Sequence, residues 1–214
     1  VSLSPAQSAR ALLVAQAFRT AGLSGLKKEG FTDGILTRGA LFFADGDTLF
    51  ETLMLNLVAY PENSYFRTLA HDAPAWEQTG DDDEHFVPYG YLDYLTWQNT
   101  RILLFPQREG DGIVVREMTI APGLRQPEEL RSPLKAYKPG KDRPMRIDFS
   151  EHRALWRDYE TLYAFDDDQR QPPVVVQWLH ALVSQRHLEL EQAYQLRTLG
   201  MLADQAKPIF YRDQ

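Results

Sequence analysis

The feature that most constrains the fold is a pair of apolar, strand-like runs, TRILLFPQ and IVVREMTIA, on either side of the turn Gly110-Asp111-Gly112. Such runs, separated by a short glycine-containing turn, are typical of an antiparallel β-hairpin. Elsewhere the chain shows no alternation of strands with helices, which a doubly wound parallel sheet requires. We therefore expect an α+β fold: mixed helices and short antiparallel sheets with projecting β-hairpins, and no doubly wound parallel sheet.

Helices are indicated by capping residues and by apolar side chains at helical spacing. Over residues 4–22, Ser4 is placed to cap a helix, Pro5 stands at its first position and Gly22 at its end. Further helices are expected after a cap at Asp47 or Thr48, shortly before Trp97, over residues 150–165 and from Val174.

Composition bounds the class of protein. The chain has 214 residues, 43% of them apolar and 25% charged, and no cysteine. These values are ordinary for a globular protein, and we expect one globular domain over residues 1–214. No apolar run reaches the roughly 20 residues of a membrane span, and no signal peptide opens the chain, so a cytoplasmic protein without membrane contact is expected. Val1 leads almost directly into a helix, which suggests a fragment of a longer chain.

Signals for a metal, a cofactor or catalysis are weak, and we expect none of the three. His180 and His187 are the closest histidines, and no carboxylate stands beside them at a familiar ligand spacing. The aspartate runs 81–83 and 166–168 are more typical of solvated loops than of Mg²⁺ sites. No nucleophile elbow, zinc-protease helix or phosphate loop is present. A hydrolase assembled from scattered histidines and aspartates remains as an alternative.

Positive charge gathers on one segment of an acidic chain whose formal net charge is -7. Only Asp142 opposes the basic residues of this segment, which are Arg131, Lys135, Lys138, Lys141, Arg143 and Arg146. Two short arms around Lys138-Pro139-Gly140-Lys141 predict a hairpin, and proline followed by glycine favours a type II turn. The segment is either a solvated hairpin or a thin lysine-bearing projection that enters a DNA groove. In the first case its charge would be balanced by acidic neighbours such as Glu151, Asp158 and Glu160.

Two other segments have features that suit contact with a polyanion. A glycine-and-lysine loop starts at Gly22, and its backbone can approach a ligand where a Cβ would obstruct. Asp204 and Gln205 stand at the expected tip of a C-terminal hairpin. Taken alone, the first segment is a helix stop with solvated lysines and the second is a polar turn.

In order along the chain, these features resemble CasA, the large subunit of the type I-E CRISPR surveillance complex called Cascade. The resemblance rests on six segments, which are ALLVAQAFRTAGLSG, TRGALFFADGDTLFETLMLNLV, GYLDYLTWQ, SPLKAYKPGK, HRALWRDYETLY and LGMLADQAKPIFYRD. Each segment is modest alone, but six in the right order over most of the chain are specific.

The resemblance implies a non-catalytic subunit that reads the protospacer-adjacent motif (PAM) in double-stranded DNA from the minor groove. It also implies a wedge that opens the adjacent base pair to start R-loop formation, and support for recruiting a helicase-nuclease. The implied partners are PAM-bearing DNA, other Cascade subunits and CRISPR RNA. The implied DNA contacts are of three kinds. The first is a glycine loop over Gly22–Gly25, which includes Ser24 and is followed by Lys27 and Lys28. The others are a lysine finger at Lys138, or alternatively Lys141, and a glutamine wedge at Gln205, next to Asp204.

The chain also departs from this family. CasA-like proteins are longer, and the resemblance places residues 1–214 in the central part of a larger N-terminal domain, without the C-terminal helical bundle. An acidic protein-interaction module with no role in DNA binding remains a second alternative. Salt-dependent DNA binding that is lost in Lys138→Ala separates the CasA-like hypothesis from both alternatives.

Overall fold

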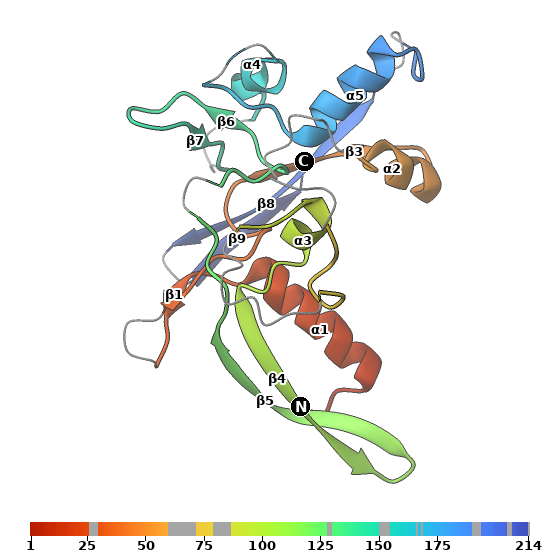
Figure 1. The fold of residues 1–214 in the computed structure, drawn as a ribbon, viewed down its shortest axis with the longest axis vertical. Coiled ribbons are helices and arrows are strands. Elements are labelled where there is room, and N and C mark those ends of the chain that lie inside the picture. Colours follow the sequence, from red (N-terminus) through yellow and green to blue (C-terminus); the bar gives the residue numbers. More distant parts are fainter. Residues whose placement is uncertain are drawn as a thin grey trace. The chain divides into compact units, whose positions relative to one another are not determined.

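The computed structural model describes residues 1–25, 30–59, 72–78, 87–127, 130–149, 155–165, 167, 169–189, 194–204 and 207–213. The chain divides into two compact units. The first comprises Val1–Thr37, Phe66–Leu130 and Gln205–Lys207, and the second comprises Arg38–Tyr65, Arg131–Asp204 and Pro208–Gln214. Figure 1 shows the helices and strands of both units. This division does not test whether the units fold together, so the single domain stays a prediction.

The first unit begins with helix α1 (Pro5–Phe18), whose start is confirmed. The Ser4 hydroxyl accepts a hydrogen bond from the Gln7 backbone, and the Gln7 side chain accepts one from the Ser4 backbone, which is a capping box. The predicted stop at Gly22 is wrong. The chain leaves the helix after Phe18 because the Arg19 carbonyl accepts hydrogen bonds from the backbone of Gly34 and the hydroxyl of Thr37 instead.

The unit continues with two small sheets and a short helix. Strands β1 (Gly22–Leu23) and β2 (Gly30–Phe31) form one antiparallel pair, and α3 (Tyr91–Leu95) precedes the long ribbon of β4 (Thr100–Glu109) and β5 (Gly112–Pro122).

The ribbon β4–β5 confirms the first predicted hairpin (Figure 1). Its register runs from Thr100 opposite Pro122 to Glu109 opposite Gly112, and Gly110 at the turn has a φ of 58°. Glycine adopts this left-handed conformation without a steric cost. Most residues in the far half of the ribbon are exposed, but Val115 is buried and pairs with Leu3. Helix α1 packs against the ribbon, and its Gln16 side chain hydrogen-bonds the backbone of Thr100.

The second unit is built on the sheet β3–β8–β9, which comprises β3 (Ala40–Asp45), β8 (Gln195–Asp204) and β9 (Lys207–Asp213, in this unit from Pro208). Strands β3 and β8 are antiparallel, from Ala40 opposite Gly200 to Asp45 opposite Gln195. The other elements are the pair β6 (Tyr137–Lys138) and β7 (Met145–Arg146), and the helices α2 (Leu49–Leu55), η2 (a 3-10 helix, Leu155–Asp158), α4 (Tyr159–Leu162) and α5 (Val174–Ser184).

The core of the second unit lies where α2, α5 and the β6–β7 arms meet β3. Its buried members are Ala40, Phe42, Ala44, Leu55, Ala136, Ile147, Phe149, Val175, Val176 and Leu179. Helix α2 starts at the cap Thr48, as predicted, because the Thr48 hydroxyl accepts a hydrogen bond from the Glu51 backbone.

The α+β class is confirmed, with several small antiparallel sheets and projecting hairpins. Of the helix predicted over residues 150–165, residues 150–154 lie outside the described residues. From Leu155 the chain forms the 3-10 helix η2 and the one-turn helix α4, which ends at Leu162 and leaves Tyr159 exposed. None of the helices in the described part of the chain is long and apolar enough to cross a membrane.

Candidate nucleic-acid interface

The glycine loop lies in the first unit, between β1 and β2. Gly22 pairs with Phe31 and Leu23 with Gly30, so the two strands form the base of the loop. A Cβ on Gly30 would lie 3.1 Å from the Gly22 carbonyl oxygen, which explains a glycine there by close backbone approach. Gly25 is different, because it is exposed and a Cβ on it would meet nothing within 4 Å. The protein's own packing therefore does not require a glycine at position 25.

The base of the glycine loop is held from both sides. The Asp33 carboxylate accepts a hydrogen bond of 2.8 Å from the Ala21 backbone, just before β1. The Arg19 guanidinium lies over the Phe31 ring, 3.8 Å from its centroid. Sequence analysis missed Arg19, Phe31 and Asp33, since no motif joins them. Ser24 is half-buried in this loop, and the predicted contacts Lys27 and Lys28 lie outside the described residues.

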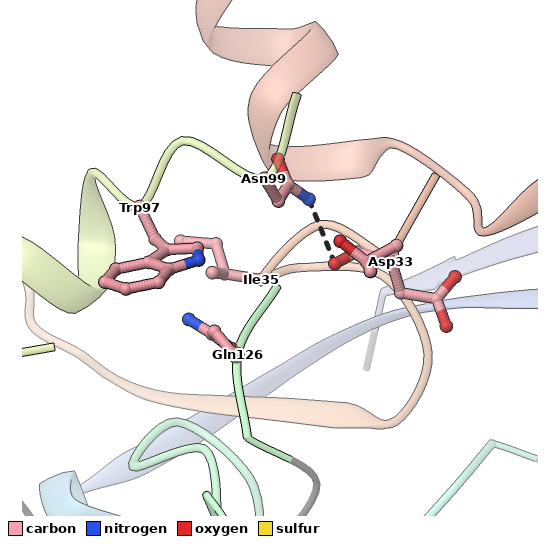
Figure 2. A pocket seen from close by; sticks show the side chains of 6 residues that line it. Asp33, Ile35, Trp97, Asn99 and Gln126 are labelled. Carbon is pink, nitrogen blue, oxygen red and sulfur yellow. Dashed lines mark hydrogen bonds between the residues drawn. The ribbon is translucent and has the colours of Figure 1, made fainter. Parts of the chain in front are cut away.

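A small cavity is lined by residues that follow β2, by residues just before β4 and by Gln126, which follows β5 (Figure 2). Its volume is about 70 Å³, and Asn99 closes one side by donating a hydrogen bond of 3.0 Å to the Asp33 carbonyl. The Trp97 indole donates another to the Leu124 carbonyl. Pockets for drug-sized ligands are roughly 300–1,000 Å³, so this cavity is too small for a nucleotide. Its polar contacts brace the chain next to the glycine loop.

The cationic hairpin has a buried base in the second unit. Tyr137 pairs with Arg146 and Lys138 with Met145, while Ala136 and Ile147 next to them are fully buried. On its other edge Tyr137 exchanges two backbone hydrogen bonds of 2.9 Å with Gln171. Burial raises the pKa of Tyr137 above its ordinary value, so its phenol is neutral near pH 7.

The hairpin is confirmed, but its tip differs from the predicted type II turn. The strands end at Lys138 and Met145, and residues 139–144 form a wider loop between them. A type II turn needs a positive φ at Gly140, and the described glycines with positive φ are Gly39 and Gly110. Gly140 is instead required by packing, because a Cβ on it would lie 2.2 Å from the Arg143 carbonyl oxygen.

The two candidate lysines of this hairpin have different environments. Lys138 Nζ lies 3.1 Å from Asp158 Oδ1, and the two side chains are 27% and 11% exposed. Lys141 is exposed in the loop, and among the described residues no carboxylate lies within ion-pair distance of it. The neighbouring cations also differ, since Lys135 is buried and Arg146 pairs with Asp148 at 2.8 Å. The cationic segment is therefore not uniformly solvated.

The third candidate contact begins at the end of β8, which belongs to the second unit up to Asp204. Asp204 is the last residue of β8 and is exposed, and Gln205 lies outside the described residues. Strands β8 and β9 are neighbours joined through residues 205 and 206, which confirms the predicted hairpin. The strand below Asp204 is firmly packed, with Met201 and Ala203 buried.

Comparison with known proteins decides the family. The family model described as CRISPR-associated protein Cse1 matches residues 1–214, the whole chain. The chain belongs to the Cse1 family. A curated CasA/Cse1 protein of Thermus thermophilus is 37% identical over 224 aligned positions, which cover 97% of this chain and 41% of that protein. The resemblance to CasA is thereby confirmed.

Solved structures of Cse1 proteins have the same fold. Thermus thermophilus CasA matches with a TM-score of 0.76 at 29% identity, over 100% of this chain and 47% of that one. Cse1 from Acidimicrobium ferrooxidans matches with a TM-score of 0.77 at 25% identity, over 100% and 44%. This Cse1-family chain therefore spans less than half the length of these relatives.

The alternative of a hydrolase is not supported by the two histidines that the structure describes, His180 and His187, while His71, His85 and His152 lie outside the described residues. His180 and Ser184 line an open hollow at the end of α5, but the Ser184 hydroxyl donates to the His180 carbonyl rather than to an imidazole. The His180 ring stacks on Phe165 with 4.4 Å between the ring centroids. A nucleophile needs a general base within hydrogen-bond reach, and this arrangement does not supply one. Among the described residues, no group of three or more His, Cys, Asp or Glu side chains could hold a metal ion.

Proposed function

We propose that this Cse1-family chain is the DNA-recognition part of a Cascade large subunit. In this role it is non-catalytic and reads the PAM of double-stranded DNA from the minor groove. It then wedges open the adjacent base pair to start R-loop formation and supports recruitment of the helicase-nuclease. The proposed partners are PAM-bearing DNA, CRISPR RNA and other Cascade subunits, in the cytoplasm.

The observation that carries this proposal is an exposed lysine loop on a buried hairpin base, within an acidic chain of the Cse1 family. A rigid base lets a thin cationic projection reach into a groove without a large loss of conformational entropy. The net charge of -7 opposes binding along the rest of the duplex, so contact is confined to local cationic sites.

The other two candidate contacts suit the same role. Gly25 offers a backbone without a side chain to the edge of the groove. No packing contact within the protein requires a glycine there, because a Cβ on Gly25 would meet nothing within 4 Å. The proposed wedge Gln205 directly follows β8, and this strand would support it because Met201 and Ala203 near its end are buried. Unstacking one step costs a few kcal/mol, and a wedge must push against a firm support.

A protein-interaction role has one observation in its favour. Five large apolar side chains in and just after α2 are exposed: Leu49, Phe50, Leu53, Met54 and Leu57. Exposed apolar clusters of this kind mark contact surfaces. A large subunit of a complex needs such surfaces as well as a DNA site, so this observation is compatible with the main proposal.

The proposed function is tested in the assembled complex that carries Gln205→Ala. Strand opening on a PAM-bearing target is followed by the reactivity of unpaired thymines. We expect slower opening with PAM binding largely retained, because the wedge acts after recognition. Opening at the normal rate would show that Gln205 is not the wedge, and equal binding of duplexes with and without the PAM would refute the proposed function.

A further inference from the structure

The contact between Lys138 and Asp158 joins two parts of the second unit that are distant in sequence. Lys138 ends β6 at the root of the cationic loop, and Asp158 ends the 3-10 helix η2. Lys138 Nζ donates a hydrogen bond of 3.1 Å to Asp158 Oδ1. With side chains 27% and 11% exposed, the pair is largely withdrawn from water.

This burial determines what Lys138 can do. Breaking a largely buried ion pair costs more than breaking an exposed one, because its charges have lost much of their hydration. Swinging Lys138 out to a DNA groove would give up its hydrogen bond and ion pair with Asp158. The backbone at Lys138 is restricted as well, since the following Pro139 disfavours helical conformations and Tyr137 is bonded to Gln171.

Lys141 has none of these restraints. It is exposed in the loop 139–144, and no carboxylate in the described part of the chain is within ion-pair distance of it. The loop that carries it is compact, because Gly140 packs directly beneath the Arg143 carbonyl. The ion pair fixes the end of β6, and the close contact between Gly140 and Arg143 keeps the loop compact. Together they restrict where the backbone of Lys141 can lie.

We propose that Asp158 is a positioning residue: by holding Lys138 at the root of the hairpin, it aims the loop 139–144 so that Lys141 is the lysine presented to DNA. This inference rests on the proposed function and deepens it. It predicts the direction in which DNA affinity changes when Asp158 is removed. If Lys138 itself contacted DNA, Asp158 would compete with DNA for it, and removing Asp158 would tighten binding. If Asp158 aims the loop, removing it weakens binding.

The test uses the assembled complex with variants of this subunit and two duplexes, one with the matching PAM and one with a scrambled PAM. We expect Lys141→Ala to lower affinity for the PAM duplex by about tenfold, with the thermal midpoint unchanged. Asp158→Ala should lower PAM affinity and the ratio of PAM to scrambled binding. The charge swap Lys138→Asp with Asp158→Lys restores the ion pair and should keep PAM affinity within about threefold of wild type. Arg101→Ala, which removes an exposed cation from β4, serves as the control and should change neither readout.

Two results overturn the inference: tighter PAM binding in Asp158→Ala, or a charge swap that loses as much affinity as Lys141→Ala while its thermal midpoint is retained. If the swap does not fold, the uncharged pair Lys138→Gln with Asp158→Asn replaces it. This pair keeps PAM affinity if Lys138 is only a brace and loses it if Lys138 contacts DNA. A wild-type complex that binds both duplexes equally would refute the proposed function itself. This failure is distinguishable from failure of the inference about Asp158, because it is seen without any variant.

Discussion

The guanidinium carbon of Arg19 lies 3.8 Å from the centroid of the Phe31 ring. Arg19 directly follows α1, and Phe31 is the last residue of β2, so this contact closes the two ends of the segment that contains the glycine loop. Both residues are half-buried. Cation–π contacts contribute about 0.5–1 kcal/mol at exposed sites and about 2 when desolvated, so this one is a substantial local clamp.

Loss of this clamp should loosen the glycine loop. We expect Arg19→Ala to lower the free energy of unfolding by about 1 kcal/mol and to speed hydrogen exchange of the Gly22 and Leu23 amides. Exchange measured by mass spectrometry or NMR checks this, with Arg101→Ala as the control for loss of a cation. Unchanged exchange at β1 in Arg19→Ala would show that the backbone hydrogen bonds alone hold the loop.

Gly25→Ala should separate binding from folding. Because an added Cβ meets nothing within 4 Å, the free energy of unfolding should change by no more than about 0.5 kcal/mol. If the backbone at Gly25 approaches the DNA groove, the same methyl group obstructs it, and affinity for PAM duplex should fall several-fold. Calorimetry and DNA titration of the assembled complex check the two parts. Wild-type affinity in this variant would remove Gly25 from the site.

Gly200→Ala, unlike Gly25→Ala, should lower the free energy of unfolding strongly. A Cβ at this position of β8 would lie 1.9 Å from the Phe149 ring, so either the strand or the ring must move. Overpacking of a core typically costs about 1–3 kcal/mol, and we expect a loss at the upper end. Phe149→Leu should relieve part of it, giving a coupling between the two sites in a double-mutant cycle. Additive losses would mean that Phe149 is not the obstacle.

Tyr91 should make stability depend on pH in the alkaline range. Burial raises the pKa of Tyr91 to about 12, from an ordinary value of 10.0. Between these values the folded chain keeps the phenolic proton and the unfolded chain loses it. Tyr91 therefore stabilises the fold fully below pH 10, and this stabilisation falls by about 1.4 kcal/mol per pH unit as pH rises toward 12. Urea unfolding from pH 8 to 11 should show a shallower decline in Tyr91→Phe than in wild type; equal slopes would contradict the assignment.

The apolar stripe on α2 should affect association more than folding. Phe50 and Leu53 lie on this stripe and are largely exposed. The double variant Phe50→Ser with Leu53→Gln removes little buried area, so the free energy of unfolding should change by less than about 1 kcal/mol. Self-association of the isolated chain, measured by light scattering or sedimentation, should decrease. The matched control is Leu55→Ala on the buried face of the same helix, which should lower stability by about 2–5 kcal/mol. A large stability loss in the stripe variant would show that the stripe is packed in solution.

Local signals in the sequence predicted elements whose causes are local. Ser4 caps α1 and Thr48 caps α2, because both interact with residues three positions away. The turn at Gly110 joins β4 and β5 because glycine tolerates its positive φ. In the candidate site, strands flank the glycine loop and form both predicted hairpins, whereas the DNA contacts themselves stay predictions. The end of α1 was not predictable, since it depends on hydrogen bonds from Gly34 and Thr37 to Arg19.

The sequence by itself determined the α+β class, the Cse1 family and the segments that hold the candidate contacts, because capping, turn chemistry and motif order are properties of neighbouring residues. Only the tertiary structure decided the environment of each contact. From the three acidic neighbours that the sequence offered, it selected Asp158 as the partner of Lys138. It left Lys141 exposed, although both lysines stand in the same short turn sequence. The physical reason is that ion pairs and burial depend on which distant elements pack together, and spacing along the chain carries no record of that packing.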